Sequence, residues 1–113
     1  MGLEDELDQF HGTTRYYRNF TGLLFTDGIN YLADRAGCYW LVDLVGSYQR
    51  RLEDVPFQLW EIELHDDRSA VVVMSEDTND PVLVRQRIPY TDFPLKEFSF
   101  YCVHNVMMLK SEY

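Results

Sequence analysis

The clearest concentration of side chains that could support a binding activity is a run of carboxylates in the middle of the chain. Residues 53–80 contain nine acidic residues and a single base, Arg68, so this segment contributes −8 to a net charge of −9. Exposed carboxylates attract and orient basic partners. We therefore expect a partner-binding surface made of Glu61, Glu63, Asp66, Asp67, Glu76, Asp77 and Asp80.

Two shorter groups contain residue types found in catalytic or metal sites, but their spacing suits neither chemistry. Cys102 and His104 would share one face of a strand, yet a cysteine nucleophile needs a bonded base and a third group that orients the base. His65, Asp66 and Asp67 are adjacent in a turn-forming stretch, where side chains rarely converge on one cation. The six glycines are isolated and form no phosphate-binding loop. We predict no catalytic, cofactor-binding or metal-binding residue and no cofactor.

A cluster of aromatic and basic residues lies near the start of the chain, where Tyr16 and Tyr17 stand between Arg15 and Arg18. Such a cluster can stack on a nucleic-acid base or another planar ligand. The pattern also fits a strand with Tyr16 turned inward and the arginines paired with the acidic segment. We favour the second interpretation.

The overall charge restricts the classes of partner. A phosphate-binding surface needs clustered Lys and Arg, but this chain has ten of these residues against 19 acidic ones. We therefore expect no direct binding to nucleic acid and none to an anionic membrane surface. A protein partner is compatible with the charge, either a basic protein or a second copy of the chain. Solubility alone would also explain the acidity.

Length and composition favour a single domain over residues 1–113, with enough apolar residues, 46%, for a core. No apolar run approaches the roughly 20 residues of a membrane span. The first ten residues carry four acids and no base, unlike a signal peptide. Cys38 and Cys102 lie in apolar runs without the spacing of a disulfide framework. We expect a cytoplasmic protein with both cysteines reduced and buried.

Helical periodicity dominates the first half of the chain. Residues 3–10 predict a short acidic helix, and residues 13–26 are extended in character. Residues 29–52 carry two apolar stripes at helical spacing that point in nearly opposite directions, which predicts a helix kinked at Gly37. Thr26 or Asp27 is the expected N-cap of this helix.

The second half changes to the two-residue period of strands, predicted at 57–64, 70–77, 82–90, 97–103 and 106–109. In the first of them Trp60, Ile62 and Leu64 share one face, and Glu61 and Glu63 share the other. The pair His104-Asn105 fits a two-residue hairpin turn because both residue types tolerate positive φ.

These elements predict an α+β fold: a largely antiparallel β-meander of about five strands, with the kinked helix (29–52) and the short N-terminal helix packed on one face. In such a meander Glu61 and Glu63 face the same side as Arg85 and Arg87. One intervening strand separates the two pairs, so direct ion pairing is not assured.

Four segments of the sequence resemble a family of small, single-domain, uncharacterised bacterial proteins, a domain of unknown function. They are ELDQFHGTTRYYRN, LLFTDGINYLADRAGCYWLVDL, IPYTDFPLKEF and NVMMLKSEY, which together span most of the chain. The resemblance implies a stand-alone bacterial cytoplasmic protein and supplies no catalytic residue.

Three functions are compatible with these observations. The first, which we favour, is a non-enzymatic protein-interaction domain that binds a basic partner or itself. The second is an acidic inhibitor whose carboxylates imitate the phosphates of a nucleic acid on a host or phage enzyme. The third is a small enzyme with an aromatic pocket, which would require polar groups that converge on a concave site.

Overall fold

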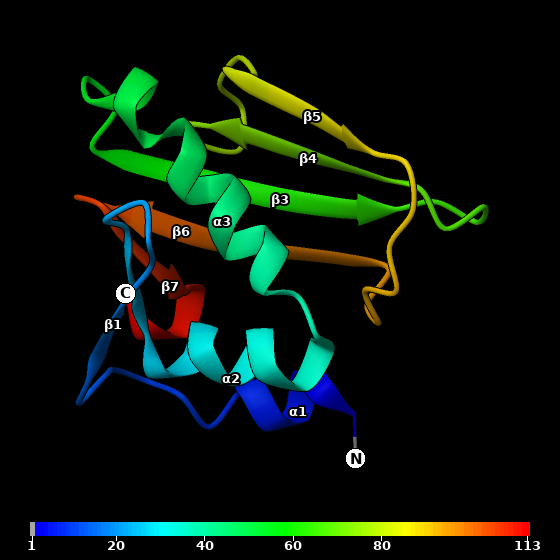
Figure 1. Cartoon of the computed structure of the whole chain (residues 1–113), viewed down its shortest axis with the longest axis horizontal. Helices are drawn as coiled ribbons and strands as arrows, with labels where there is room; N and C mark the ends of the chain where they lie inside the picture. Colours follow the sequence, from blue (N-terminus) through cyan, green and yellow to red (C-terminus); the bar gives the residue numbers. More distant parts are fainter. Residues whose placement is uncertain (1) are drawn as a thin grey trace.

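The computed structural model describes residues 2–113 as one mixed sheet with helices on one face, and it confirms the α+β class (Figure 1). The helices are α1 (Leu3–Leu7), α2 (Asp27–Ala36) and α3 (Tyr39–Tyr48), with 3-10 turns η1 (Gln49–Leu52) and η2 (Lys110–Glu112). The strands are β1 (Tyr16–Arg18), β2 (Leu24–Thr26), β3 (Phe57–Leu64), β4 (Ala70–Ser75), β5 (Val84–Ile88), β6 (Glu97–Val103) and β7 (Val106–Leu109). The strand order is β1-β2-β7-β6-β3-β4-β5.

The helical region breaks where the apolar stripes change direction. Gly37 has φ 63°, a left-handed conformation that favours glycine, and it ends α2 before α3 begins. The side chain of Thr26 caps α2 by accepting a hydrogen bond from the amide of Ile29. The predicted kink and cap are therefore confirmed, although the helix starts at Asp27 and the N-terminal helix ends at Leu7 instead of Phe10.

The sheet is not the predicted meander, because β6 pairs with β3 and not with β5. The segment between β5 and β6 passes the turn between β3 and β4, where Arg68 holds it. The guanidinium of Arg68 donates to the carbonyls of Thr91 (3.1 Å) and Phe93 (3.2 Å), and the Phe93 side chain is buried. After this anchored segment, β6 pairs with the side of β3 that β4 leaves unpaired, so β3 becomes a central strand.

The sheet has seven strands instead of about five, because the extended segment before α2 also joins it. β1 and β2 form a short antiparallel hairpin, and β2 lies parallel to β7, with Leu24 opposite Val106. Three residues are too few to show strand alternation in the sequence. The turn between β6 and β7 is as predicted, with φ 49° at His104 and 67° at Asn105.

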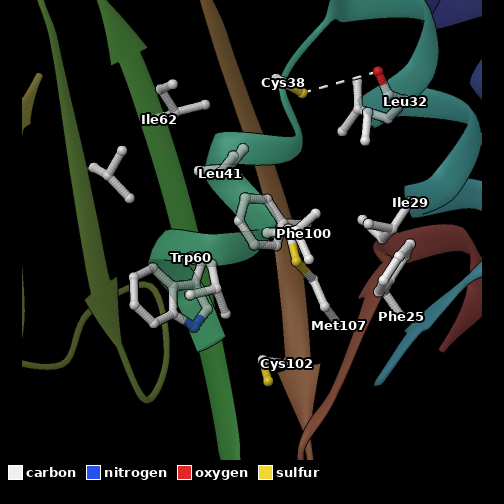
Figure 2. Packing of buried hydrophobic residues seen from close by; sticks show 14 of the residues in the cluster. Phe25, Ile29, Leu32, Cys38, Leu41, Trp60, Ile62, Phe100, Cys102 and Met107 are labelled. Atoms are coloured by element: carbon white, nitrogen blue, oxygen red, sulfur yellow. Dashed lines mark hydrogen bonds between the residues drawn. The ribbon is translucent and has the colours of Figure 1, made fainter. Parts of the chain in front are cut away.

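The core lies between the sheet and helices α2 and α3, and Trp60 and Phe100 stand near its centre (Figure 2). Cys38 and Cys102 are free and buried in this layer, as expected. Burial raises the pKa of each thiol to about 12, so both stay protonated at neutral pH. Within residues 2–113, no helix has the length and apolar character needed to cross a membrane.

Candidate protein-binding face

The face of the sheet opposite α2 and α3, here called the open face, has no helical layer over it (Figure 1). Strand alternation divides β3 between the two sides. Trp60 and Ile62 enter the helix-side core, whereas Glu61 and Glu63 lie on the open face as predicted. Val71 and Val73 on β4 are half-buried on the same face, so the open face is part apolar and part acidic.

A hollow of about 710 Å³ runs over the open face, and we call it the open-face groove. Strands β3, β4 and β6 form its floor, α1 and η2 border one side, and β5 borders the other. Its lining includes Glu61, Glu63, Val71, Val73, Glu97 and Ser99 from the floor, Glu4, Asp8, Lys110 and Ser111 from one border, and Val82 and Arg85 from the other. Five carboxylates therefore stand against two basic side chains.

The carboxylates of the floor face one another across neighbouring strands. The register places Glu63 directly opposite Glu97, and Glu61 opposite Ser99. Like charges at directly opposed positions destabilise a sheet. Among residues 2–113, the only ionic contact of the groove carboxylates is 3.9 Å, between His65 Nε2 and Glu63 Oε1. The groove is thus a negative surface, and no other ion pair in the described chain offsets this repulsion.

Arg85 and Arg87 do lie on the open face, but they do not neutralise the glutamates. Val73 stands between Glu61 and Arg85 in the sheet register, and the described chain has no ion pair between β3 and β5. The amino group of Lys110, the other base beside the groove, lies 5.7 Å from the ring centroid of Tyr101. The carboxylates on the floor therefore remain available to a cation from a partner.

The other predicted site residues lie away from the groove. Asp66 and Asp67 occupy the turn between β3 and β4, and Glu76, Asp77 and Asp80 occupy the loop at the opposite end of β4. Of the seven predicted residues, only Glu61 and Glu63 line the groove. Sequence reasoning missed Glu97, which the β3–β6 pairing brings beside them, and Glu4 and Asp8, which α1 supplies.

Asp67 has a structural partner in its own turn. Its Oδ1 accepts hydrogen bonds from the hydroxyl of Ser69 (2.6 Å) and from the amide of Ser69 (2.9 Å), and these bonds lower the pKa of the carboxyl. A lowered pKa in the folded state means that the carboxylate stabilises the fold above its unfolded pKa of about 4. That contribution is lost as pH falls through the lowered value.

We expect Asp67→Asn to reduce the urea midpoint at pH 7, with the difference from wild type shrinking as pH falls below about 4. Asp66→Asn is the matched control, because no hydrogen bond involves its side chain among the described residues. Urea unfolding of the three proteins at neutral and acidic pH measures both effects. An Asp67→Asn deficit that is the same at both pH values would contradict this assignment.

An aromatic group adjoins the groove along β3 and β6. Phe57, Tyr101 and Tyr113 contact one another, with ring centroids 4.9 to 5.5 Å apart, and Tyr113 is 71% exposed. Leu59 pairs with Tyr101, and Glu61, the next residue of β3 on the same face, pairs with Ser99, so the aromatic group continues directly into the acidic floor. A ligand on the open face would meet apolar and acidic surfaces side by side.

The arginine and tyrosine cluster is oriented differently from the prediction. Tyr17 is the inward residue and stacks on Phe25 at 5.5 Å, whereas Tyr16 is 59% exposed. The β1–β2 register decides this, because Tyr17 lies opposite the buried Phe25. The predicted pairing of Arg15 and Arg18 with the acidic segment is also wrong, since neither forms an ion pair in the part of the chain that the structure describes.

The residues weighed as catalytic do not assemble. Cys102 is buried on β6, while His104 is exposed in the turn that follows. Within residues 2–113, no three His, Cys, Asp or Glu side chains lie close enough to hold one metal ion. The groove is therefore the site with the clearest chemical character in the described structure.

A known family model covers this chain. The sequence model of a family described as "Family of unknown function (DUF6876)" matches residues 1–113. The chain belongs to this family. No curated protein matches the sequence, and no solved structure matches it.

Three of the four segments that carry the resemblance to DUF6876 meet at the start of α2. Asp27 accepts hydrogen bonds from the amide and hydroxyl of Thr14, and Glu112 accepts them from the hydroxyl of Thr26 (2.6 Å) and the amide of Gly28 (3.1 Å). These polar groups satisfy one another, so the cluster is a structural clasp. The clasp holds η2, which borders the groove.

Proposed function

We propose that this DUF6876 domain is a non-enzymatic protein-interaction module that binds a basic segment of a partner protein in its open-face groove. The observation that supports the proposal is the cross-strand group of Glu61, Glu63 and Glu97 on an uncovered sheet face. A partner that supplies Lys or Arg would relieve the repulsion within this group and gain steering from the net charge of −9.

The groove favours arginine-containing segments in an extended conformation. The floor spans three neighbouring strands, and Val71 and Val73 offer apolar area beside the carboxylates. A long basic side chain can lay its stem on such area while its head reaches a carboxylate. Arginine suits the site better than lysine because its planar guanidinium can bind a carboxylate through two hydrogen bonds.

The placement of the acids gives less support to the nucleic-acid-mimicking inhibitor. Such a mimic presents carboxylates along one outward surface, but here Glu61 and Glu63 lie in a hollow, and Glu76, Asp77 and Asp80 lie in a loop at the far end of β4. The enzyme hypothesis gains no support from converging polar groups. The buried, unpaired cysteines favour a reducing compartment, so we place the interaction in the cytoplasm.

The test compares two triple variants that remove the same charge. Glu61→Gln/Glu63→Gln/Glu97→Gln neutralises the groove, and Glu76→Gln/Asp77→Asn/Asp80→Asn is the matched control outside it. The probe is a fluorescent peptide with arginine at alternate positions, together with the same peptide carrying glutamate instead.

We expect wild type and control to bind the arginine peptide equally, with affinity that falls as salt rises. The groove variant should bind at least about tenfold more weakly, a loss of about 1.4 kcal/mol. Its thermal midpoint should match or exceed that of wild type, because the Glu63–Glu97 repulsion is removed. Equal weakening by the two triple variants would assign the effect to net charge and refute a groove site.

A further inference from the structure

We infer that the basic partner of the groove is a second copy of this chain, which inserts the arginine–tyrosine edge formed by Tyr16 and Arg18 of β1. This inference rests on the function proposed above. It assigns a role to the arginine and tyrosine cluster, which the groove itself does not use.

The edge is exposed and rigidly held. β1 is the outermost strand of the sheet, and Tyr16 on it is 59% exposed. Asn19 fixes the turn that follows β1: its Nδ2 donates to Asp43 (2.7 Å), and its Oδ1 accepts from the amide and hydroxyl of Thr21 (3.0 and 2.7 Å). An edge that is already held in place loses little conformational entropy on binding.

The edge and the groove lie on the same side of the sheet. Tyr17 stacks on Phe25, which packs against Tyr39 of α3, so Tyr17 belongs to the helix side. By strand alternation, Tyr16 and Arg18 belong to the open face. Strands β2, β7 and β6 separate β1 from β3. Two copies whose open faces meet can therefore place each edge over the partner's groove, which is the reciprocal contact of a two-fold dimer.

Charge determines which parts of the two open faces can meet. Each copy carries −9, so contact between random surfaces of two copies is repulsive. Arg18 has no ion pair in the described chain, and neither Glu61 nor Glu97 has a cationic partner there. The edge over the groove brings Arg18 to these carboxylates and leaves Tyr16 beside the group of Phe57, Tyr101 and Tyr113.

The test uses two charge reversals, Arg18→Glu on the edge and Glu63→Arg in the groove, with Arg50→Glu at an exposed position of η1, after α3, as the matched control. Sedimentation velocity gives the oligomeric state, and circular dichroism melts establish that each variant folds. We expect wild type and the control to form a concentration-dependent dimer that salt weakens. Each reversal alone should weaken the dimer at least about tenfold, because like charges then face each other.

An equimolar mixture of the two reversed proteins should dimerise again. In the mixed dimer Arg18 of one copy meets Glu63 of the other, and the introduced glutamate meets the introduced arginine. Wild type that stays monomeric, reversed proteins that still dimerise alone, or a mixture that stays monomeric would each overturn the inference.

The same proteins separate this inference from the function on which it rests. The Arg18→Glu variant keeps an intact groove, so it should bind the arginine peptide even when it cannot dimerise. Peptide binding by a wild type that does not dimerise would remove the second copy as the partner and leave the groove function standing. A folded Arg18→Glu protein that fails to bind the peptide would refute both.

Discussion

Replacing Trp60 by alanine is expected to lower the free energy of unfolding by about 3–5 kcal/mol, the cost of removing a large buried aromatic side chain. Trp60 is 0% exposed on the central strand β3. Its ring lies parallel to that of Phe100, with centroids 6.5 Å apart, and its Nε1 donates to Gln58 Oε1 at 2.8 Å. Alanine leaves a cavity and removes one of the two donors to the buried Gln58 Oε1, the other being Gln49 Nε2, so both effects destabilise the fold.

Glu61→Ala, one position along the same strand, is the control and should change the free energy of unfolding by less than about 0.5 kcal/mol. Its side chain lies on the open face and forms no ion pair in the described chain. Urea midpoints of wild type and the two variants measure the difference. Equal shifts for the two variants would mean that the side assigned to Trp60 is wrong.

The phase of β3 could be predicted from the sequence because it depends on local alternation alone. Trp60 and Ile62 are apolar while Glu61 and Glu63 are charged, and any sheet that buries one face must turn the charged pair outward. The break at Gly37 and the turn at His104-Asn105 were predictable for the same reason, since each depends on the backbone preferences of one or two residues.

The neighbours of β3 could not be predicted in the same way. A meander places each strand beside the next in sequence, but β6 lies beside β3 because Arg68 and Phe93 anchor the returning segment. The Glu63–Glu97 pair depends on that long-range register, so no local pattern identifies Glu97 as a site residue. The orientation of Tyr16 and Tyr17 also depended on an unseen partner, Phe25 on β2.

The Glu63–Glu97 pair bears directly on the proposed function. A sheet gains stability when oppositely charged or apolar residues face each other, so an opposed glutamate pair costs folding free energy. Binding of a cation between the two carboxylates would recover that cost, and the partner would then stabilise the fold by mass action. The pair that lowers the folding stability of the free domain would therefore raise the affinity for a basic partner.

The second large effect is expected at Glu112, which joins the end of the chain to the start of α2. We expect Glu112→Ala to lower the free energy of unfolding by about 2–3 kcal/mol, because hydrogen bonds to a charged group are worth about 1.5–3 kcal/mol. The carboxylate accepts hydrogen bonds from Thr26 Oγ1, from the amide of Gly28 and from the amide of Leu109. It also lies at the positive end of the α2 dipole. Glu53→Ala, at an exposed position near η1, is the control and should have little effect.

Gly28 provides a second route to the same contact, so the two substitutions form a double-mutant cycle. A Cβ at Gly28 would lie 2.5 Å from Glu112 Oε1 and 2.5 Å from Leu109 Cδ1, so Gly28→Ala must displace the carboxylate. Because both changes break the same contact, the double variant should lose less free energy of unfolding than the sum of the two single losses. Both should also weaken binding of the arginine peptide, since η2 borders the groove. Urea unfolding of the four proteins gives the coupling energy, and strictly additive losses would show that Glu112 and Gly28 act independently.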